Sequence, residues 1–98
     1  MATLIVTASL KDGEDEARGR YLQAVTPFLM AAGGQPVKRL RVTNVVSGNA
    51  DAALALVMDF PDTQTINDAF ASPEYKALLP DRDKGFSNME ILVTEDFG

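Results

Sequence analysis

Four short apolar segments alternate with two stretches of helical character, and this order constrains the fold more than any other feature. The segments cover residues 3–9, 36–48, 53–60 and 89–94. Short runs rich in Leu, Ile and Val are typical of β-strands. The order strand–helix–strand–strand–helix–strand predicts a ferredoxin-like α+β fold, in which a four-stranded antiparallel sheet carries both helices on one face. The 98 residues suit a single domain over residues 1–98.

The first helical stretch is predicted from its apolar spacing and its ends. Apolar residues recur at intervals of three and four, at Ala17, Tyr21, Ala24, Phe28 and Ala31. Asp12 is the expected N-cap, and Gly33-Gly34 supplies the stop. Pro27 predicts a kink near residues 23–27 within one helix, because the apolar stripe continues through it.

The turns and the second helical stretch are predicted from composition. Residues 47–51 read as a turn that joins the second and third strands into an antiparallel hairpin. A helix is expected from Pro61-Asp62-Thr63, with Thr65 and Asp68 at capping-box spacing and Asp62 or Thr63 as alternative caps. Ser72-Pro73-Glu74 predicts a fresh helix start with Ser72 as N-cap. Residues 80–85 read as a charged loop.

The composition excludes several classes of function. The chain has no Cys and no His, so it lacks the commonest ligands and bases, and we expect no metal and no cofactor. A tyrosine-ligated haem is the one haem arrangement left open. The net charge of −5 disfavours nucleic acid and anionic membranes. RNA-recognition domains share this strand order, but Phe60 is the only aromatic residue on the two central strands here.

The N-terminal residues predict a cytoplasmic protein. They lack the basic region of a signal peptide and read instead as a first strand. No apolar run approaches the ~20 residues that span a bilayer.

Apolar residues lie on both faces of the predicted strands, which points to a partner. The residues that cover both faces of the first, third and last strands are Leu4, Ile5, Val6, Leu54, Leu56, Val57, Met58, Ile91, Leu92 and Val93. An open sheet with helices on one face should be polar on the other if that face met water. We therefore expect a second copy to cover the helix-free face in a two-fold homodimer.

A set of spaced residues resembles a known family. The set comprises Tyr21 followed by Pro27, then Gly33-Gly34, Arg39, Gly48, and Ser72-Pro73-Glu74-Tyr75 followed by Leu78 and Arg82. Together they resemble the domain of unknown function 1330 family of the dimeric α/β-barrel superfamily, over nearly the whole chain. The resemblance implies a ferredoxin-like protomer and a homodimer whose sheets close into a barrel. It implies no reaction, although ligands of the superfamily often sit between helices and sheet.

Four residues are the candidate ligand-binding set. Arg39, beside Arg41 on the same strand face, is a candidate clamp for a carboxylate, although a rim position or a dimer ion pair would explain it too. Tyr21 and Tyr75 could orient a ligand or simply pack with their hydroxyls at the edge of the core. Arg82 could close a cleft over an anion or form an ion pair at a helix end.

Other polar residues have a weaker functional interpretation. Asp59 and Glu90 are candidate bases if burial raises their pKa, but paired or edge positions are the more ordinary explanation. Ser72 reads as an N-cap, because no histidine exists to activate it. Asp81, Asp83 and Glu74 do not form the full calcium-binding pattern, so a solvated loop is favoured over a metal site.

Three functions follow from these observations. The leading one is a homodimeric protein that binds a small anionic or aromatic metabolite in a cleft between helices and sheet. The second is a cofactor-independent isomerase or monooxygenase that uses Tyr, Arg and carboxylate groups. The third is an interaction module without chemistry, which would lack a cavity between its helices and its sheet.

Overall fold

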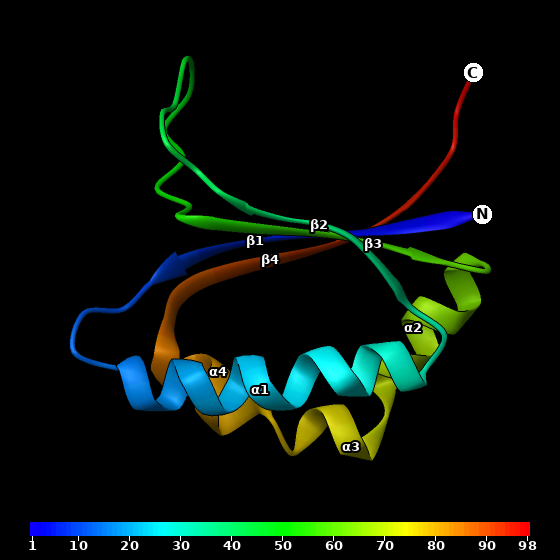
Figure 1. Ribbon diagram of the computed structural model, residues 1–98, viewed down its shortest axis with the longest axis horizontal. Helices are drawn as coiled ribbons and strands as arrows, with labels where there is room; N and C mark the ends of the chain where they lie inside the picture. The colour runs from blue at the N-terminus through cyan, green and yellow to red at the C-terminus, as the bar shows by residue number, and fades with distance from the viewer.

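The computed structural model describes residues 1–98 and confirms the ferredoxin-like α+β fold. Its elements are β1 (Ala2–Leu10), α1 (Asp15–Ala31), β2 (Gln35–Arg41), β3 (Leu54–Phe60), α2 (Thr63–Ala71), α3 (Pro73–Lys76), α4 (Leu79–Gly85) and β4 (Phe86–Glu95). The strands form one antiparallel sheet in the order β2-β3-β1-β4. Figure 1 shows all the helices on the same face of this sheet.

The core lies between the sheet and the helices. Because side chains alternate along a strand, Ala2, Leu4 and Ala8 of β1 point toward the helices and are buried. The largest fully buried side chains are Leu4, Leu29, Met58, Phe60 and Ile66. Removing each of them from water contributes about 1.5–3 kcal/mol to folding.

Helix α1 is continuous across Pro27, as predicted, but it begins later than predicted. Its N-cap is Glu14, not Asp12, because Gly13 turns the chain at a φ of +76° before the helix starts. Gly33 ends it at a φ of +113°, and the Gly34 N–H donates to the Leu29 carbonyl at 2.9 Å. Although α1 is the longest helix, neither it nor any other is long and apolar enough to cross a membrane.

The predicted second strand over residues 36–48 is wrong beyond Arg41. β3 begins at Leu54, and beyond the hydrogen bond from the Val42 N–H to the Ala53 carbonyl at 2.8 Å the two chain segments separate, so residues 42–53 form a loop. The Ser9 hydroxyl donates to Asp51 at 2.6 Å and holds the base of this loop. Figure 1 shows the loop rising from the sheet on the side opposite the helices, as does the C-terminal end. β2 and β3 are antiparallel neighbours, as expected.

The second helical stretch is divided into three short helices. Asp62 caps α2 by accepting from the Thr65 N–H at 2.7 Å. The Thr65 hydroxyl also donates to this carboxylate, and the hydroxyl first and the N–H second lower the pKa of Asp62. Ser72 caps α3, as predicted. The predicted loop over residues 80–85 is wrong: these residues lie in α4, where Pro80 occupies a first-turn position that needs no N–H. β4 begins at Phe86, earlier than predicted, because Phe86 pairs with Leu10 across a bulge.

Two glycines of the helical layer have opposite surroundings. A Cβ on Gly85 would lie 2.7 Å from the Arg18 Cα, whereas a Cβ on Gly19 would meet nothing within 4 Å. We therefore expect Gly85→Ala to lower the free energy of unfolding by about 1–3 kcal/mol through overpacking of α4 against α1. Gly19→Ala should raise it by about 0.5–1 kcal/mol, because alanine favours a helix interior. Urea unfolding measures both, and equal effects of the two variants would contradict this packing.

Candidate functional site

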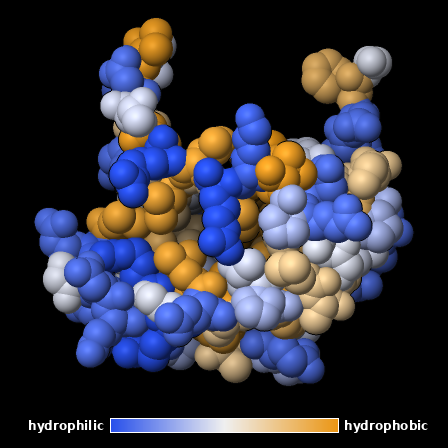
Figure 2. Space-filling view, viewed as in Figure 1, coloured by the Kyte–Doolittle hydropathy of each residue, from blue (hydrophilic) through white to orange (hydrophobic).

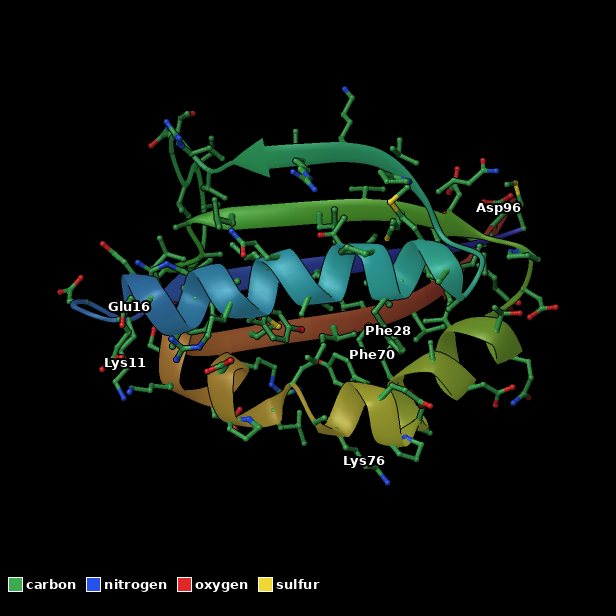
Figure 3. The ribbon with its side chains drawn as sticks, turned by 60° about the horizontal axis from the view of Figure 1, so that its bottom comes forward. Lys11, Glu16, Phe28, Phe70, Lys76 and Asp96 are labelled. Carbon is green, nitrogen blue, oxygen red and sulfur yellow. The ribbon has the colours of Figure 1, made fainter.

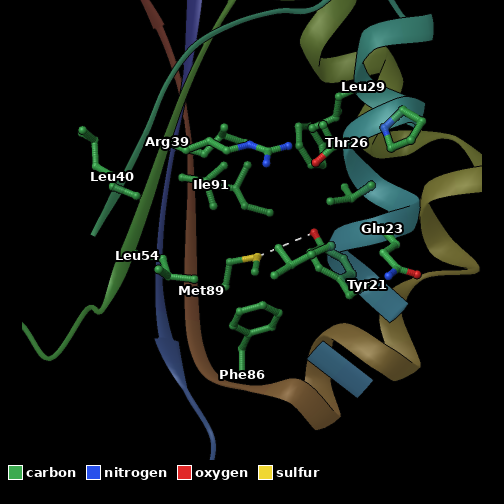
Figure 4. Close-up of a pocket in the computed structure, with 17 residues that line it drawn as sticks. Tyr21, Gln23, Thr26, Leu29, Arg39, Leu40, Leu54, Phe86, Met89 and Ile91 are labelled. Atoms are coloured by element: carbon green, nitrogen blue, oxygen red, sulfur yellow. Dashed lines mark hydrogen bonds between the residues drawn. The ribbon is translucent and has the colours of Figure 1, made fainter. Parts of the chain in front are cut away.

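A cavity of about 510 Å³ separates α1 from the sheet. Residues of α1, of all four strands and of α2 line it, and 13 of its 17 lining residues are hydrophobic. Figure 2 shows apolar surface in the hollow between the sheet and α1, and Figure 4 shows the lining side chains. Arg39 is the only charged residue among them. The other polar groups are the Tyr21 hydroxyl, Gln23 and Thr26.

The spacing of α1 places its side chains on this cavity. Tyr21, Val25 and Leu29 are four residues apart, so they form one buried stripe that faces the sheet. On the opposite wall, Val6, Leu56 and Ile91 project from β1, β3 and β4 in matching register. The cavity is therefore built from two regular elements and not from loops.

A chain of hydrogen bonds runs from the helical layer to the cavity. An Arg82 guanidinium N–H donates to the Tyr75 hydroxyl at 3.2 Å, and the Tyr75 and Tyr21 hydroxyls lie 2.8 Å apart. The Tyr21 hydroxyl also donates to Met89 Sδ at 3.7 Å, which is the dashed line in Figure 4. Three of the four predicted ligand-binding residues thus belong to one connected group.

Aromatic packing holds Tyr75 in place within this group. The Tyr75 ring lies edge-on to Phe70 with centroids 4.7 Å apart, and it lies 6.3 Å from Phe28. Figure 3 labels Phe28 on α1 and Phe70 on α2, the two rings that pack against Tyr75. Tyr21 in turn packs edge-on against Phe86, with centroids 5.6 Å apart. Such edge-on contacts favour the observed orientation of both phenol rings.

Burial and hydrogen bonding set the protonation of this group. Burial raises the pKa of Tyr21 well above its ordinary value, and the hydrogen bond with Tyr75 raises it further. Burial acts to lower the pKa of Arg82, but its hydrogen bonds to Tyr75 and Asp83 outweigh burial and raise it. Tyr21 is therefore neutral and Arg82 is charged across the physiological range.

Arg39 lies on β2, apart from the phenol chain. Figure 4 shows its side chain reaching from the strand toward α1 near Thr26, while Leu40 points away on the other side. Arg39 is exposed and forms no ion pair. Of the predicted set, Arg39 and Tyr21 line the cavity. Tyr75 and Arg82 do not line it, and they are connected to Tyr21 by hydrogen bonds.

Sequence reasoning missed part of the lining. Phe70, Phe86 and Met89 contribute to the cavity wall. The sequence did not indicate Phe86, because the apolar run of the last strand begins at Met89 and the strand itself begins three residues earlier. Gln23 and Thr26 did carry a signal, because they are polar residues that flank the apolar stripe of α1.

The candidate bases Asp59 and Glu90 lie away from the cavity. Asp59 pairs with Thr3 in the sheet register and accepts a hydrogen bond from its hydroxyl at 2.9 Å. Glu90 pairs with Thr7, four residues further along β1, so roughly 13 Å of strand separates the two carboxylates. Both belong to the helix-free face.

The remaining polar candidates have structural partners. Asp81 accepts a forked pair of hydrogen bonds from Arg20, which lower its pKa, and Asp83 accepts from Arg82. The Ser72 hydroxyl donates to the Ala69 carbonyl while it caps α3. No group of three or more Asp or Glu side chains is placed to hold a metal ion.

The sheet order and the position of all helices on one face define a ferredoxin-like α+β protein. The sequence matches the family described as "Domain of unknown function (DUF1330)" over residues 2–97, so the chain belongs to that family. The resemblance noted from the sequence is thereby confirmed. A comparison with functionally curated proteins found no match.

Solved structures of similar fold include proteins from several bacteria. A protein of unknown function from Rhodopseudomonas palustris superimposes with a TM-score of 0.80 at 13% identity, covering 99% of this chain and 82% of that one. A DABB family protein with a ferredoxin-like fold from Mesorhizobium loti gives 0.71 at 20% identity, covering 99% and 97%. An antibiotic biosynthesis monooxygenase gives 0.67 at 12% identity, covering 100% of both chains. At these identities the likeness shows the fold alone.

The buried phenol predicts a link between ionisation and unfolding. In a Tyr75→Phe variant, Tyr21 is the only tyrosine. Its folded pKa is raised above the unfolded value of about 10. The contribution of Tyr21 to the free energy of unfolding is therefore fully present below about pH 10, and it is lost as the pH rises beyond that value. We expect the ultraviolet absorbance change of phenolate to coincide with loss of circular dichroism. Reversible ionisation near pH 10 in a folded protein would contradict the burial of Tyr21.

Proposed function

We propose that this chain is a homodimeric binding protein for a small apolar acid, which enters the cavity beneath α1. The observation that carries the proposal is an apolar cavity with one charged lining residue, the unpaired Arg39. A volume of about 510 Å³ falls within the range of small-molecule sites.

The lining favours a particular chemistry of ligand. Thirteen hydrophobic residues suit an aromatic or aliphatic body. The planar guanidinium of Arg39 suits a carboxylate, which it can bind through two parallel hydrogen bonds. Because no carboxylate lines the cavity, nothing there repels an anion.

Binding is better supported than acid–base catalysis. The cavity holds no histidine, cysteine or carboxylate, and its one phenol has a raised pKa. No lining side chain is therefore suited to take up a proton near neutral pH. An interaction module without chemistry is disfavoured by the cavity itself, because such a module would pack its helices against the sheet.

The helix-free face of the sheet supports the homodimer. Ile5 stands between Val57 and Leu92 in the sheet register, which gives an apolar row across three strands. Leu92 is 48% exposed in the single chain. The loop over residues 42–53 and the C-terminal end project on this side and expose Val46 and Phe97 (Figure 1). Figure 2 shows apolar surface between the two projections. A second copy would cover these groups.

The role of Arg39 is testable with a simple aromatic acid. We expect Arg39→Gln to weaken binding of γ-phenylbutyrate by about 10–100-fold, since a hydrogen-bonded charge contributes about 1.5–3 kcal/mol. Isothermal titration calorimetry measures this change. The melting temperature should stay unchanged, because Arg39 is exposed and unpaired.

Arg41→Gln is the matched control. It removes the same charge two residues further along β2, from a side chain that does not line the cavity. We expect this variant to bind within about twofold of the wild type. Equal weakening by both variants would show that long-range attraction, and not a clamp by Arg39, binds the acid.

The dimer is testable by light scattering after size exclusion. The wild type should elute at twice the chain mass of 10.5 kDa. Leu92→Glu should shift it to the monomer, because it places a charge in the apolar row of the sheet. Met30→Glu is the control, as Met30 is 51% exposed at the end of α1, away from this face. A wild-type monomer would refute the dimer.

A further inference from the structure

Arg82 sets the direction of the hydrogen bonds that end at the cavity. A guanidinium can only donate, so the Tyr75 hydroxyl must accept from it at 3.2 Å. The only other hydrogen-bonding group in reach of the Tyr75 hydroxyl is the Tyr21 hydroxyl at 2.8 Å. Tyr75 is buried, so it donates its own proton to the Tyr21 oxygen.

The proton of Tyr21 is then left for the cavity. Its only acceptor is Met89 Sδ at 3.7 Å, and a thioether is a weak acceptor. Both Tyr21 and Met89 line the cavity, and Figure 4 shows the Tyr21 hydroxyl directed at the Met89 sulfur. An oxygen acceptor on the ligand would form a stronger bond than the sulfur does. Each donor in the chain also polarises the next, which makes the last proton a better donor.

We propose that Tyr21 donates this hydrogen bond to a carbonyl oxygen of the ligand, with Tyr75 and Arg82 as positioning residues behind it. The proposal rests on ligand binding in the cavity. It narrows the ligand class to oxo acids, here meaning apolar carboxylic acids that also carry a ketone carbonyl. The carboxylate would meet Arg39 on β2, and the carbonyl would meet Tyr21 on α1. A neutral carbonyl suits this end because the neutral phenol has no formal charge with which to balance an anion.

The packing makes Tyr21 a preorganised donor. Its ring is fixed edge-on against Phe86, at 5.6 Å, and against Tyr75, at 6.4 Å. Tyr75 is fixed by Phe70, and the Arg82 guanidinium lies 5.9 Å from the Tyr75 ring centroid. Binding therefore requires little further ordering of these side chains, which favours affinity and selectivity.

Matched pairs of acids test the proposal. β-Benzoylpropionate and γ-phenylbutyrate differ only in that a carbonyl replaces a methylene. γ-Benzoylbutyrate and δ-phenylvalerate form the same pair with one more methylene, which allows for the span between Arg39 and Tyr21. We expect the wild type to bind the oxo acid of at least one pair about tenfold more tightly. Tyr21→Phe should reduce that ratio to about one or below while it retains binding of the methylene acid.

Infrared spectroscopy separates donation from mere packing. With a ¹³C-labelled ketone, the bound carbonyl stretch should lie at lower frequency than in an aprotic solvent, and Tyr21→Phe should abolish this shift. Tyr75→Phe and Arg82→Met should leave a smaller shift, because Tyr21 remains but is no longer polarised. An unaltered shift in both variants would overturn their positioning role.

The outcomes distinguish this proposal from the function on which it rests. If both members of each pair bind equally and the carbonyl stretch is not shifted, cavity binding stands and donation by Tyr21 is refuted. If neither acid of any pair binds, the proposed function itself fails. If Tyr21→Phe does not fold, the infrared shift in Arg82→Met and Tyr75→Phe is the test: a smaller shift than in the wild type supports donation by Tyr21, and an unaltered shift counts against the hydrogen-bond chain.

Discussion

The contact between the Tyr21 and Tyr75 hydroxyls is the interaction on which the helical layer depends. It joins α1 to α3, and Phe28 and Phe70 pack against the Tyr75 ring beside it. The two buried hydroxyls satisfy each other in an apolar setting, where an unpaired hydroxyl would cost about 1–3 kcal/mol. Through Tyr21, which also contacts Phe86 and Met89 of β4, this hydrogen bond connects α3 to α1 and to the sheet beside the cavity.

The sheet divides the molecule into two different environments. Alternation along β1 sends Leu4 and Ala8 toward the helices and Ile5 toward the open face. One face therefore forms a wall of the cavity, and the other presents an apolar row across three strands. This separation explains why Asp59 and Glu90 play no part in the cavity, since both fall on the open face of their strands.

The cavity combines an exposed charged group with a buried neutral one. Arg39 stands on the exposed edge strand β2, without a partner, so its long side chain is free to meet an anion. Tyr21 is rigid, neutral and supported from behind by a buried hydrogen bond. A charged group at the rim and a neutral donor inside together favour a ligand whose two polar ends differ in charge.

The sequence by itself determined the strand and helix order, the continuity of α1 through Pro27 and the cap at Ser72, because these depend on periodicity and on neighbouring residues. It also indicated Tyr21, Arg39, Tyr75 and Arg82, but not which of them would meet. Tertiary structure decided that three of them join in one chain, that α4 replaces the expected loop, and that β2 stops at Arg41. Each depends on partners distant in sequence, and local patterns carry no information about those partners.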